Sequence, residues 1–283
     1  MKPVSVDREK CKVCGLCVEE CGRGGVSIED GRLLISGFRC MECGHCVAIC
    51  PNDALSTEQG VPPDIIRSLI PPPELAENFL RARRSQRHYE KREIEPEVVE
   101  RLIDLARYAP SGKNAQPFEF VALRTPEARR AFTEACYERM RQAQRKLHNP
   151  VWRWFVGTFF DKRVQDPEVR RSLDRAMRRR EAGMDPLFFS APLILFVHAP
   201  AIGATPKDDC CYALYHAVLL AETLGLGSCI NGNSEVLIRH FPQLLEPLGI
   251  PRGHRVYACA TFGYPKHRFA RLVFRRAPVV EWL

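Results

Sequence analysis

The larger, C-terminal part of this 283-residue chain alternates between helical and strand-like hydrophobic patterns. Pro96 starts one amphipathic helix, because proline suits the first helical turn and apolar residues then recur at helical spacing up to Ala106. Further helices are predicted over residues 74–84, 127–147 and 208–224, and from residue 167 onward. Strands are predicted over Phe118–Leu123, Leu193–Val197 and Arg255–Phe262. We expect the last two strands to be fully buried.

Residues 1–60 show a different pattern, in which short apolar segments separate two runs of cysteine. Val26–Ile28 and Leu33–Ile35 flank Asp30-Gly31 and predict a small hairpin, because Asp-Gly is a strong turn signal. Five prolines between residues 61 and 73 then predict a stiff, extended connector. The pattern therefore indicates a small domain over residues 1–60, a proline-rich linker over 61–75 and a larger domain over 76–283.

Eight of the thirteen cysteines form two runs with the same spacing, C-x2-C-x2-C-x3-C, and Pro51 follows the second run. Three thiolates at this spacing can hold one [4Fe-4S] cluster, while the fourth reaches the neighbouring cluster. The spacing therefore predicts two clusters with crossed ligation. One cluster is expected on Cys11, Cys14, Cys17 and Cys50, and the other on Cys40, Cys43, Cys46 and Cys21.

Zinc ribbons and disulfide frameworks are the alternative explanations of these cysteines. Zinc ribbons use separated pairs of ligands, and disulfide frameworks suit small secreted domains. We expect no secretory signal before the first run and a cytoplasmic location, where thiols stay reduced. Residues 1–60 resemble bacterial two-cluster ferredoxins. Gly22 departs from that pattern, which has proline there, and this change is expected to loosen the turn after Cys21 without removing a ligand.

Charge is distributed unevenly along the chain. The formal net charge is +8, but residues 1–60 contain seven Lys and Arg against nine Asp and Glu, so they carry −2 and the remainder carries +10. An acidic electron-transfer module joined to a basic body favours mutual docking or anionic cofactors and partners. We expect no nucleic-acid partner. The longest apolar stretch, around Leu187–Val197, is too short to span a bilayer, so no membrane span is expected.

Basic residues gather at the start of the larger domain, where Arg83, Arg84, Ser85 and Arg87 lie within one short segment. Guanidinium groups and a hydroxyl suit a phosphate, although most basic runs are only solvated surface. Three motifs follow in order: PSGKNAQP at 110–117, GLGSCING at 225–232, and GYP at 263–265 ahead of Arg268 and Arg271. Together the four resemble the nitroreductase family of FMN-dependent enzymes, over about residues 76–276.

This resemblance implies an α+β fold with a mixed central sheet flanked by helices, and an intertwined homodimer with FMN at the subunit interface. It assigns the FMN phosphate and ribityl chain to Arg83, Arg84, Ser85 and Arg87, with Arg268 and Arg271 completing the phosphate clamp. The loop that reaches the partner subunit's flavin matches Pro110, Ser111, Gly112 and Asn114. The backbone beside the reactive edge of the flavin matches Ile230, Asn231 and Gly232.

The sequence departs from the nitroreductase pattern near that reactive edge. Ile230 replaces the usual aromatic residue, and Asn231-Gly232-Asn233 replaces a small glycine-rich pair. An extra amide side chain beside the flavin is one interpretation. A simple turn is the other, because asparagine before glycine commonly forms turns.

Several other residues have both structural and functional interpretations. Buried structural thiols are expected at Cys136, Cys210, Cys211, Cys229 and Cys259, with a catalytic thiol at Cys229 as the alternative. The aromatic residues between 152 and 160 are interpreted either as core and dimer interface or as a lid over the flavin. The arginines at 170–180 are expected on a solvated helix face, with docking of an acidic donor as the alternative. His198 and His216 are expected to pack beside the sheet.

These expectations combine into an iron–sulfur flavoprotein oxidoreductase. Two [4Fe-4S] clusters would pass electrons to FMN, and FMN would reduce a nitroaromatic, quinone or activated alkene. Reduced ferredoxin or NAD(P)H is the expected electron donor, and no side chain is assigned as a catalytic acid or base. Two alternatives stay open: an electron-transfer or redox-sensing protein without small-molecule turnover, and substrate oxidation with electrons leaving through the clusters.

Overall fold

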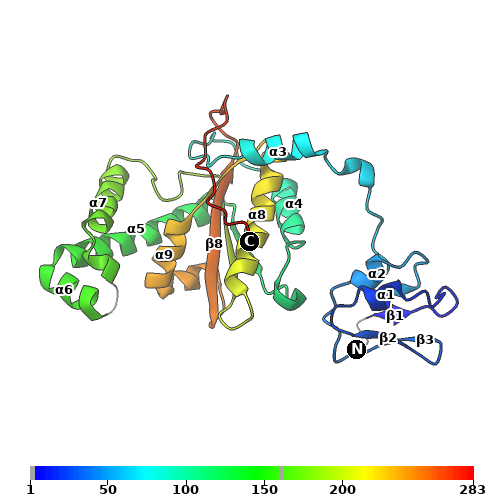
Figure 1. Cartoon of the computed structure of the whole chain (residues 1–283). Helices are drawn as coiled ribbons and strands as arrows, with labels where there is room; N and C mark the ends of the chain where they lie inside the picture. Colours follow the sequence, from blue (N-terminus) through cyan, green and yellow to red (C-terminus); the bar gives the residue numbers. More distant parts are fainter. Residues whose placement is uncertain (1–3, 160–161) are drawn as a thin grey trace. The chain divides into compact units, whose positions relative to one another are not determined.

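The computed structural model describes residues 4–159 and 162–283 (Figure 1). The chain divides into two compact units. The first contains Met1–Pro73 and the short segment Gly112–Ala115, and the second contains Glu74–Ser111 and Gln116–Leu283. Phe160, one of the aromatic residues considered above, lies outside the described residues. In the described part of the chain, no helix combines the length and the apolar character needed to cross a bilayer.

Four short strands form two antiparallel pairs in the first unit. β1 (Ser5–Val6) pairs with β4 (Leu55–Ser56), and β2 (Val26–Glu29) pairs with β3 (Arg32–Ile35). The second pair is the predicted hairpin, and φ is 47° and 72° at the successive residues of Asp30-Gly31. Left-handed conformations at both positions are those of a type I′ turn, which explains why Asp-Gly occurs there.

The first unit is an internal repeat that follows the repeated cysteine spacing. Val6 pairs with Leu55 across one sheet, and the residues at equivalent positions of the repeat, Ile35 and Val26, pair across the other. The one-turn helices α1 (Leu16–Glu19) and α2 (His45–Ala48) are equivalent too, and each follows a left-handed glycine. The two cysteine runs therefore lie in matching backbone frames related by a pseudo-twofold axis.

The linker between the two predicted domains is largely extended. Residues 61–72 contain one 3₁₀ turn, η1 (Arg67–Leu69), before α3 (Pro73–Ala82) begins. Ile65 and Leu69 are more than 70% exposed. Helix α3 ends before the predicted limit at residue 84, so Arg83 and Arg84 lie in an extended segment rather than on a helix.

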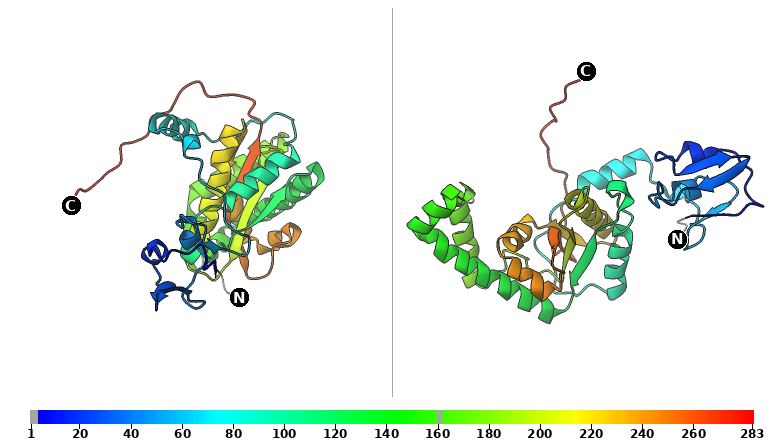
Figure 2. Two further views of the ribbon diagram at one scale, coloured as in Figure 1. Left: turned by 90° about the vertical axis from the view of Figure 1, so that its right-hand side faces the viewer. Right: turned by 90° about the horizontal axis from the view of Figure 1, so that it is seen from below.

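The second unit contains a four-stranded sheet with the order β5-β6-β8-β7, seen from two further directions in Figure 2. Its strands are β5 (Glu119–Leu123), β6 (Leu193–Pro200), β7 (Gly227–Ile230) and β8 (His254–Gly263). These four strands pair antiparallel. The parallel contribution to the predicted mixed sheet is an isolated bridge from Ser85 to Ser228, beside β7.

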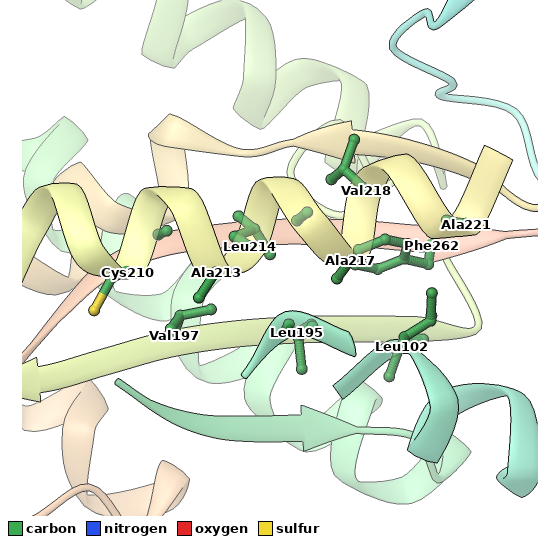
Figure 3. Packing of buried hydrophobic residues seen from close by; sticks show 14 of the residues in the cluster. Leu102, Leu195, Val197, Cys210, Ala213, Leu214, Ala217, Val218, Ala221 and Phe262 are labelled. Atoms are coloured by element: carbon green, nitrogen blue, oxygen red, sulfur yellow. The ribbon is translucent and has the colours of Figure 1, made fainter. Parts of the chain in front are cut away.

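Helices α4 (Pro96–Ala106) and α8 (Pro206–Thr223) cover one face of this sheet (Figure 3). Ala213 and Ala217 are fully buried where α8 meets β6 and β8, because small side chains let the helix approach the sheet closely. Helix α8 ends beside Gly225, whose φ of 73° suits the left-handed position after a helix. Both helices agree with the predicted ranges to within about two residues.

Helices α5 (Pro126–His148) and α9 (Gly232–His240) pack on the other face, together with η4 (Pro242–Leu248), and α7 (Pro167–Glu181) packs against α5. Phe132, Phe188 and Phe196 stack edge-on or tilted in this core. The arginines of α7 are exposed or half-buried, as expected for a solvated face. Helix α9 was not predicted, because residues 231–233 were interpreted as a turn or as an extra amide beside the flavin.

Helix α6 (Pro150–Phe159) packs against α5 and against η3 (Lys162–Gln165). Trp154 and Phe159 are 62% and 63% exposed, and they contact each other edge-on. These aromatic side chains are therefore not part of the core of this chain. An interface between subunits and a lid over the flavin remain as interpretations.

Candidate cofactor sites

Four cysteines line one cavity in the first unit: Cys11, Cys14, Cys17 and Cys50. They are the four that crossed ligation predicts for one cluster, and three come from the first run and one from the second. The rest of the lining is mostly apolar residues, including Leu33 and Leu55, with Lys12 and Asn52 as its polar members. Thiolates in an apolar pocket are the donor set and surroundings that an iron–sulfur cluster requires, so these residues fit the group.

Two of the other four cysteines of the runs belong to the same small core. Cys46 is buried and Cys21 is half-buried against it. Burial first, and then the neighbouring Cys40 and Cys43, raise the pKa of Cys46 to about 11. Cys46 is therefore costly to ionise in the protein alone, whereas coordination to a metal ion reverses that cost by stabilising the thiolate.

Strained backbone recurs at equivalent positions of the two cysteine runs. Val13 and Glu42 have φ of 52° and 55°, and they immediately precede Cys14 and Cys43. A left-handed conformation costs an L-residue roughly 1–2 kcal/mol, and it is a clear outlier for β-branched valine. Strain repeated at two matching sites indicates that each loop is shaped to wrap a bound group.

Backbone N–H groups donate to cysteine sulfur after each run. The N–H of Gly25 lies 3.2 Å from the Sγ of Cys21, and that of Ala54 lies 3.4 Å from the Sγ of Cys50. The turn after Cys21 therefore keeps the same hydrogen bond as the turn after Cys50, although Gly22 stands in place of proline. That Gly22 loosens this turn stays a prediction.

The basic segment at 83–87 lies alongside β7, although the two are far apart in the sequence. Ser85 forms a parallel bridge with Ser228, and the N–H of Gln86 donates to the carbonyl of Ser228 at 2.8 Å. A Cβ at Gly227 would lie 2.5 Å from the Cγ of Gln86. Glycine at 227 is thus what lets the basic segment approach the strand.

Charged groups of the basic segment surround Cys229. Burial raises the pKa of this thiol, while Arg87 and a hydrogen bond with Ser85 act in the opposite direction. Because burial prevails, this thiol is harder to ionise than a free cysteine, as expected of a structural thiol. Of the other four cysteines outside the two runs, Cys211 is exposed, contrary to expectation, and the rest are buried as expected.

Two buried polar atoms beside β7 have no hydrogen-bond partner within the described residues: the Nε of Arg84 and the Oγ of Ser228. Buried polar groups are almost always satisfied, so an unmet guanidinium nitrogen and hydroxyl indicate a missing polar ligand. An anionic group such as the phosphate of FMN matches them, because guanidinium groups bind phosphate through charge-assisted hydrogen bonds. The residues present therefore fit the expected cofactor.

A segment that the sequence reasoning missed adjoins this site. Phe189 and Ser190 have φ of 60° and 51°, and the ring of Phe189 lies 6.0 Å from the guanidinium carbon of Arg87. The carboxylate of Asp185 holds the segment by accepting from the backbone N–H groups of Leu187, Phe188 and Ser190. Asp185-Pro186 could have indicated this turn, because Asp before proline favours turn initiation.

The side chain of Asn231 is engaged within the fold. Its Oδ1 accepts from the N–H of Ser234 at 3.2 Å and so caps α9, and its Nδ2 donates to the carbonyl of Leu187 at 2.7 Å. Both polar atoms of this amide therefore have partners within the fold, one in α9 and one in the segment of Leu187. Ile230, just before it, is 48% exposed.

The remaining predicted FMN residues lie elsewhere. Pro110 and Ser111 follow α4, whereas Gly112–Asn114 form a 3₁₀ turn that belongs to the first unit. Within that unit the amide of Asn114 donates to the carbonyl of Glu42 at 3.0 Å. Arg268 and Arg271 lie in the exposed, irregular segment that follows β8.

Two known families match the chain, one in each of the two predicted domains. Residues 80–264 match the nitroreductase family, and residues 3–51 match the 4Fe-4S dicluster domain. The chain belongs to the nitroreductase family. It carries a 4Fe-4S dicluster domain ahead of the nitroreductase domain, as the sequence predicted.

Relatives of known sequence are distant but match over most of their length. The chloronitrobenzene nitroreductase of Comamonas testosteroni is 27% identical over 71% of this chain and 91% of its own length. A putative NADH dehydrogenase/NAD(P)H nitroreductase of Archaeoglobus fulgidus is 28% identical over 65% of this chain and 82% of its own.

Solved structures support the fold. A nitroreductase with bound FMN from Bacteroides fragilis is similar with a TM-score of 0.53 and 20% identity, covering 73% of this chain and 97% of that one. One from Desulfitobacterium hafniense, also with bound FMN, has a TM-score of 0.54 and 18% identity over 72% and 97%. The predicted α+β fold of the larger domain is therefore confirmed.

Proposed function

We propose that this nitroreductase-family protein reduces an electron-poor organic acceptor, using FMN and electrons that enter through its dicluster unit. The observation that carries the proposal is the contact between the segment at 83–87 and β7, where Arg84 and Ser228 keep unmet polar atoms. When bound, FMN supplies two-electron reduction and each [4Fe-4S] cluster supplies single electrons.

Each group of residues has a defined task in this proposal. Arg84 and Arg87 neutralise the phosphate of the cofactor, and Ser85 adds a short hydroxyl donor. The backbone of Ile230 and Gly232 lines the reactive edge, with Asn231 holding that segment against the carbonyl of Leu187. Arg268, Arg271 and the residues at 110–114 complete the site, as the family resemblance implies.

The acceptor that we favour is a nitroaromatic compound. Two relatives are named for chloronitrobenzene and nitrobenzene, and they are 27% identical to this chain. For the donor we favour reduced ferredoxin, which gives up single electrons. The two clusters carry single electrons to the flavin, whereas a hydride donor such as NAD(P)H could reduce the flavin without them. Quinones and activated alkenes are the competing acceptors.

The second subunit is also part of the proposal. The segment after β8 exposes many large apolar side chains: Phe269, Leu272, Phe274, Val279 and Trp282 are each more than half exposed. Apolar surface of this extent usually marks an interface. A homodimer would cover it and would bring the loop at 110–114 to the partner's cofactor, as the resemblance implies.

An anaerobic titration followed by visible absorbance tests the electron route. Reduced ferredoxin, NADH and NADPH are added separately to the loaded full-length protein, and nitrobenzene, a quinone and an activated alkene follow as acceptors. We expect reduced ferredoxin to bleach both clusters and flavin, and nitrobenzene to reoxidise them.

A variant in the first cysteine run, Cys14→Ala, separates the possible outcomes. The proposal requires ferredoxin-driven turnover to fall while bound FMN is retained. Direct reduction by a nicotinamide with full turnover in Cys14→Ala would contradict the route through the clusters. Reoxidation by none of the acceptors would instead support an electron-transfer or sensing protein.

A further inference from the structure

Three residues that can bind a metal ion meet at one end of the sheet. Glu119 begins β5, His198 lies late in β6 and His254 begins β8. The Nδ1 atoms of the two histidines are 3.0 Å apart, and the Nε2 of His198 is 3.8 Å from a carboxylate oxygen of Glu119. One ligand atom from each residue lies within 4.8 Å of the other two.

This cluster is separate from the FMN site. His254 is the first residue of β8, whereas Gly263, which pairs with Gly227 beside the basic segment, is the last. A strand extends by about 3.3 Å per residue, so the two sites lie at opposite ends of β8.

A β-bulge brings the two histidines to one face of the sheet. Val197 pairs with Ala258, but the next residue, His198, pairs with Val256, so Tyr257 is left without a partner. An extra residue in one strand shifts the alternation of its side chains by one position. Val256 therefore faces the same side as His198.

His254 lies two residues before Val256 and so shares that face. Without the bulge, Arg255 would take this place and His254 would point to the opposite side. Glu119 pairs directly with His198 across β5 and β6, which puts its side chain on the same face as well. The pairing of the three strands therefore places these three side chains on the same face, at the same end of the sheet.

The donor set and its spacing match a divalent transition metal. Two imidazoles and one carboxylate, with a fourth position open to water, are a common zinc ligand set. Ligand atoms about 2 Å from zinc at tetrahedral angles lie roughly 3.3 Å apart, close to the 3.0 Å between the two Nδ1 atoms, and one ligand atom from each residue lies within 4.8 Å of the others. His198 can give only one ring nitrogen to the ion, so one of its two contacts would open as the other closes.

Burial divides the three ligands into fixed and adaptable ones. His198 is only 3% exposed, whereas the side chain of Glu119 is 58% exposed. A buried imidazole held by the strand is preorganised, and an exposed carboxylate can rotate onto an arriving ion. Access from solvent is therefore available without any change in the sheet.

We propose that Glu119, His198 and His254 bind a divalent transition-metal ion, with zinc as the best match. The ion would tie β5, β6 and β8 together at the end of the sheet away from the FMN site. Its role would be structural, since an ion bound to the folded state alone raises stability by mass action.

Equilibrium dialysis of the cluster-loaded, full-length protein against Zn²⁺, with zinc and iron measured in each sample, tests this site. We expect one zinc per chain more in the unaltered protein than in His254→Gln. Glu119→Gln should bind that zinc about tenfold more weakly or worse. His240→Gln, a change on the exposed side of α9, should bind as the unaltered protein does.

Equal zinc in the unaltered protein and in His254→Gln would overturn the proposal, because the metal would then lie on cysteines or elsewhere on the surface. Thermal unfolding gives a second readout. Zinc should raise the Tm of the unaltered protein and of His240→Gln, but not that of His254→Gln. If zinc shifts none of them, the two histidines form only a hydrogen-bonded pair and the site does not exist.

Discussion

The cysteine unit and the proposed flavin site are built in opposite ways. In the first unit every predicted ligand comes from residues 11–50, and the two halves repeat the same strand register, the same left-handed positions and the same N–H donation to sulfur. In the second unit, the basic segment and β7 come from distant parts of the sequence and meet through one bridge and one close glycine contact.

This difference shows which level of structure positions the residues of each site. The cluster unit relies on local backbone conformations that a short motif can impose, and it has only a small core to support them. The flavin site relies on the packing of a whole sheet and its helices, so its residues act only after the larger core has formed. Damage to one site should therefore leave the other intact. Substitutions of Cys14 and Arg87 test this separation, and substitutions of Gly227 and Asn231 test the packing behind the flavin site.

The largest effect is expected from Cys14→Ala. Loss of one thiolate should remove one of two clusters, so iron content should fall to about half while FMN is retained. Cys211→Ala is the matched control, because Cys211 is an exposed cysteine outside the two runs. Iron analysis and visible spectra measure both. Full iron content in Cys14→Ala would show that the cavity lined by Cys14 holds no cluster.

Arg87→Ala should weaken FMN binding by about 10–100-fold, because a hydrogen bond to a charged group contributes about 1.5–3 kcal/mol. Arg81→Ala is the control, since Arg81 pairs with Glu77 on the exposed side of α3. Fluorescence titration of the flavin measures both affinities at the same salt concentration. Iron content should be unchanged in both variants, and a loss of clusters in Arg87→Ala would contradict the separation of the two sites.

Gly227→Ala should destabilise the second unit by about 1–3 kcal/mol, because the added Cβ would overlap the side chain of Gln86. Gly232→Ala is the control, since a Cβ at that position meets no atom within 4 Å. Combining Gly227→Ala with Gln86→Gly should recover much of the loss, as coupled neighbours do. Chemical denaturation measures each variant, and strictly additive effects would rule out the close contact as the cause.

Asn231→Ala should cost about 1–2 kcal/mol, because α9 loses its N-cap and the carbonyl of Leu187 loses a donor. Asn233→Ala changes an exposed asparagine nearby and should be close to neutral. If flavin spectra shift strongly in Asn231→Ala while stability is unchanged, the amide acts on the cofactor after all.

Local signals in the sequence correctly predicted much of this protein. The cysteine spacing and Asp30-Gly31 specify conformations that involve neighbouring residues, so they could be interpreted without knowing the fold. Pro96 and Gly225 mark helix ends for the same reason. Helical periodicity likewise predicted the ranges of α4, α5 and α8, because a helix that buries one face has apolar residues at helical spacing.

Contacts between distant segments could not be predicted in this way. The sequence left Asn231 as a turn residue or an extra amide beside the flavin, because its role as a cap depends on α9 and on the carbonyl of Leu187 far along the chain. The backbone of Phe189 is left-handed because the carboxylate of Asp185 accepts hydrogen bonds from the N–H groups of this segment, including that of Ser190. Each of these features depends on contacts that form only when the folded core brings distant segments together.

The sequence by itself determined the two cysteine runs, the proline-rich linker and the order of motifs that indicates the family, because these depend on residue type and spacing. Only the tertiary structure decided that Ser85 lies beside Ser228, that Gly227 admits Gln86, and that a bulge turns His254 toward His198. Strand register and close packing are set by the whole folded core rather than by any single segment.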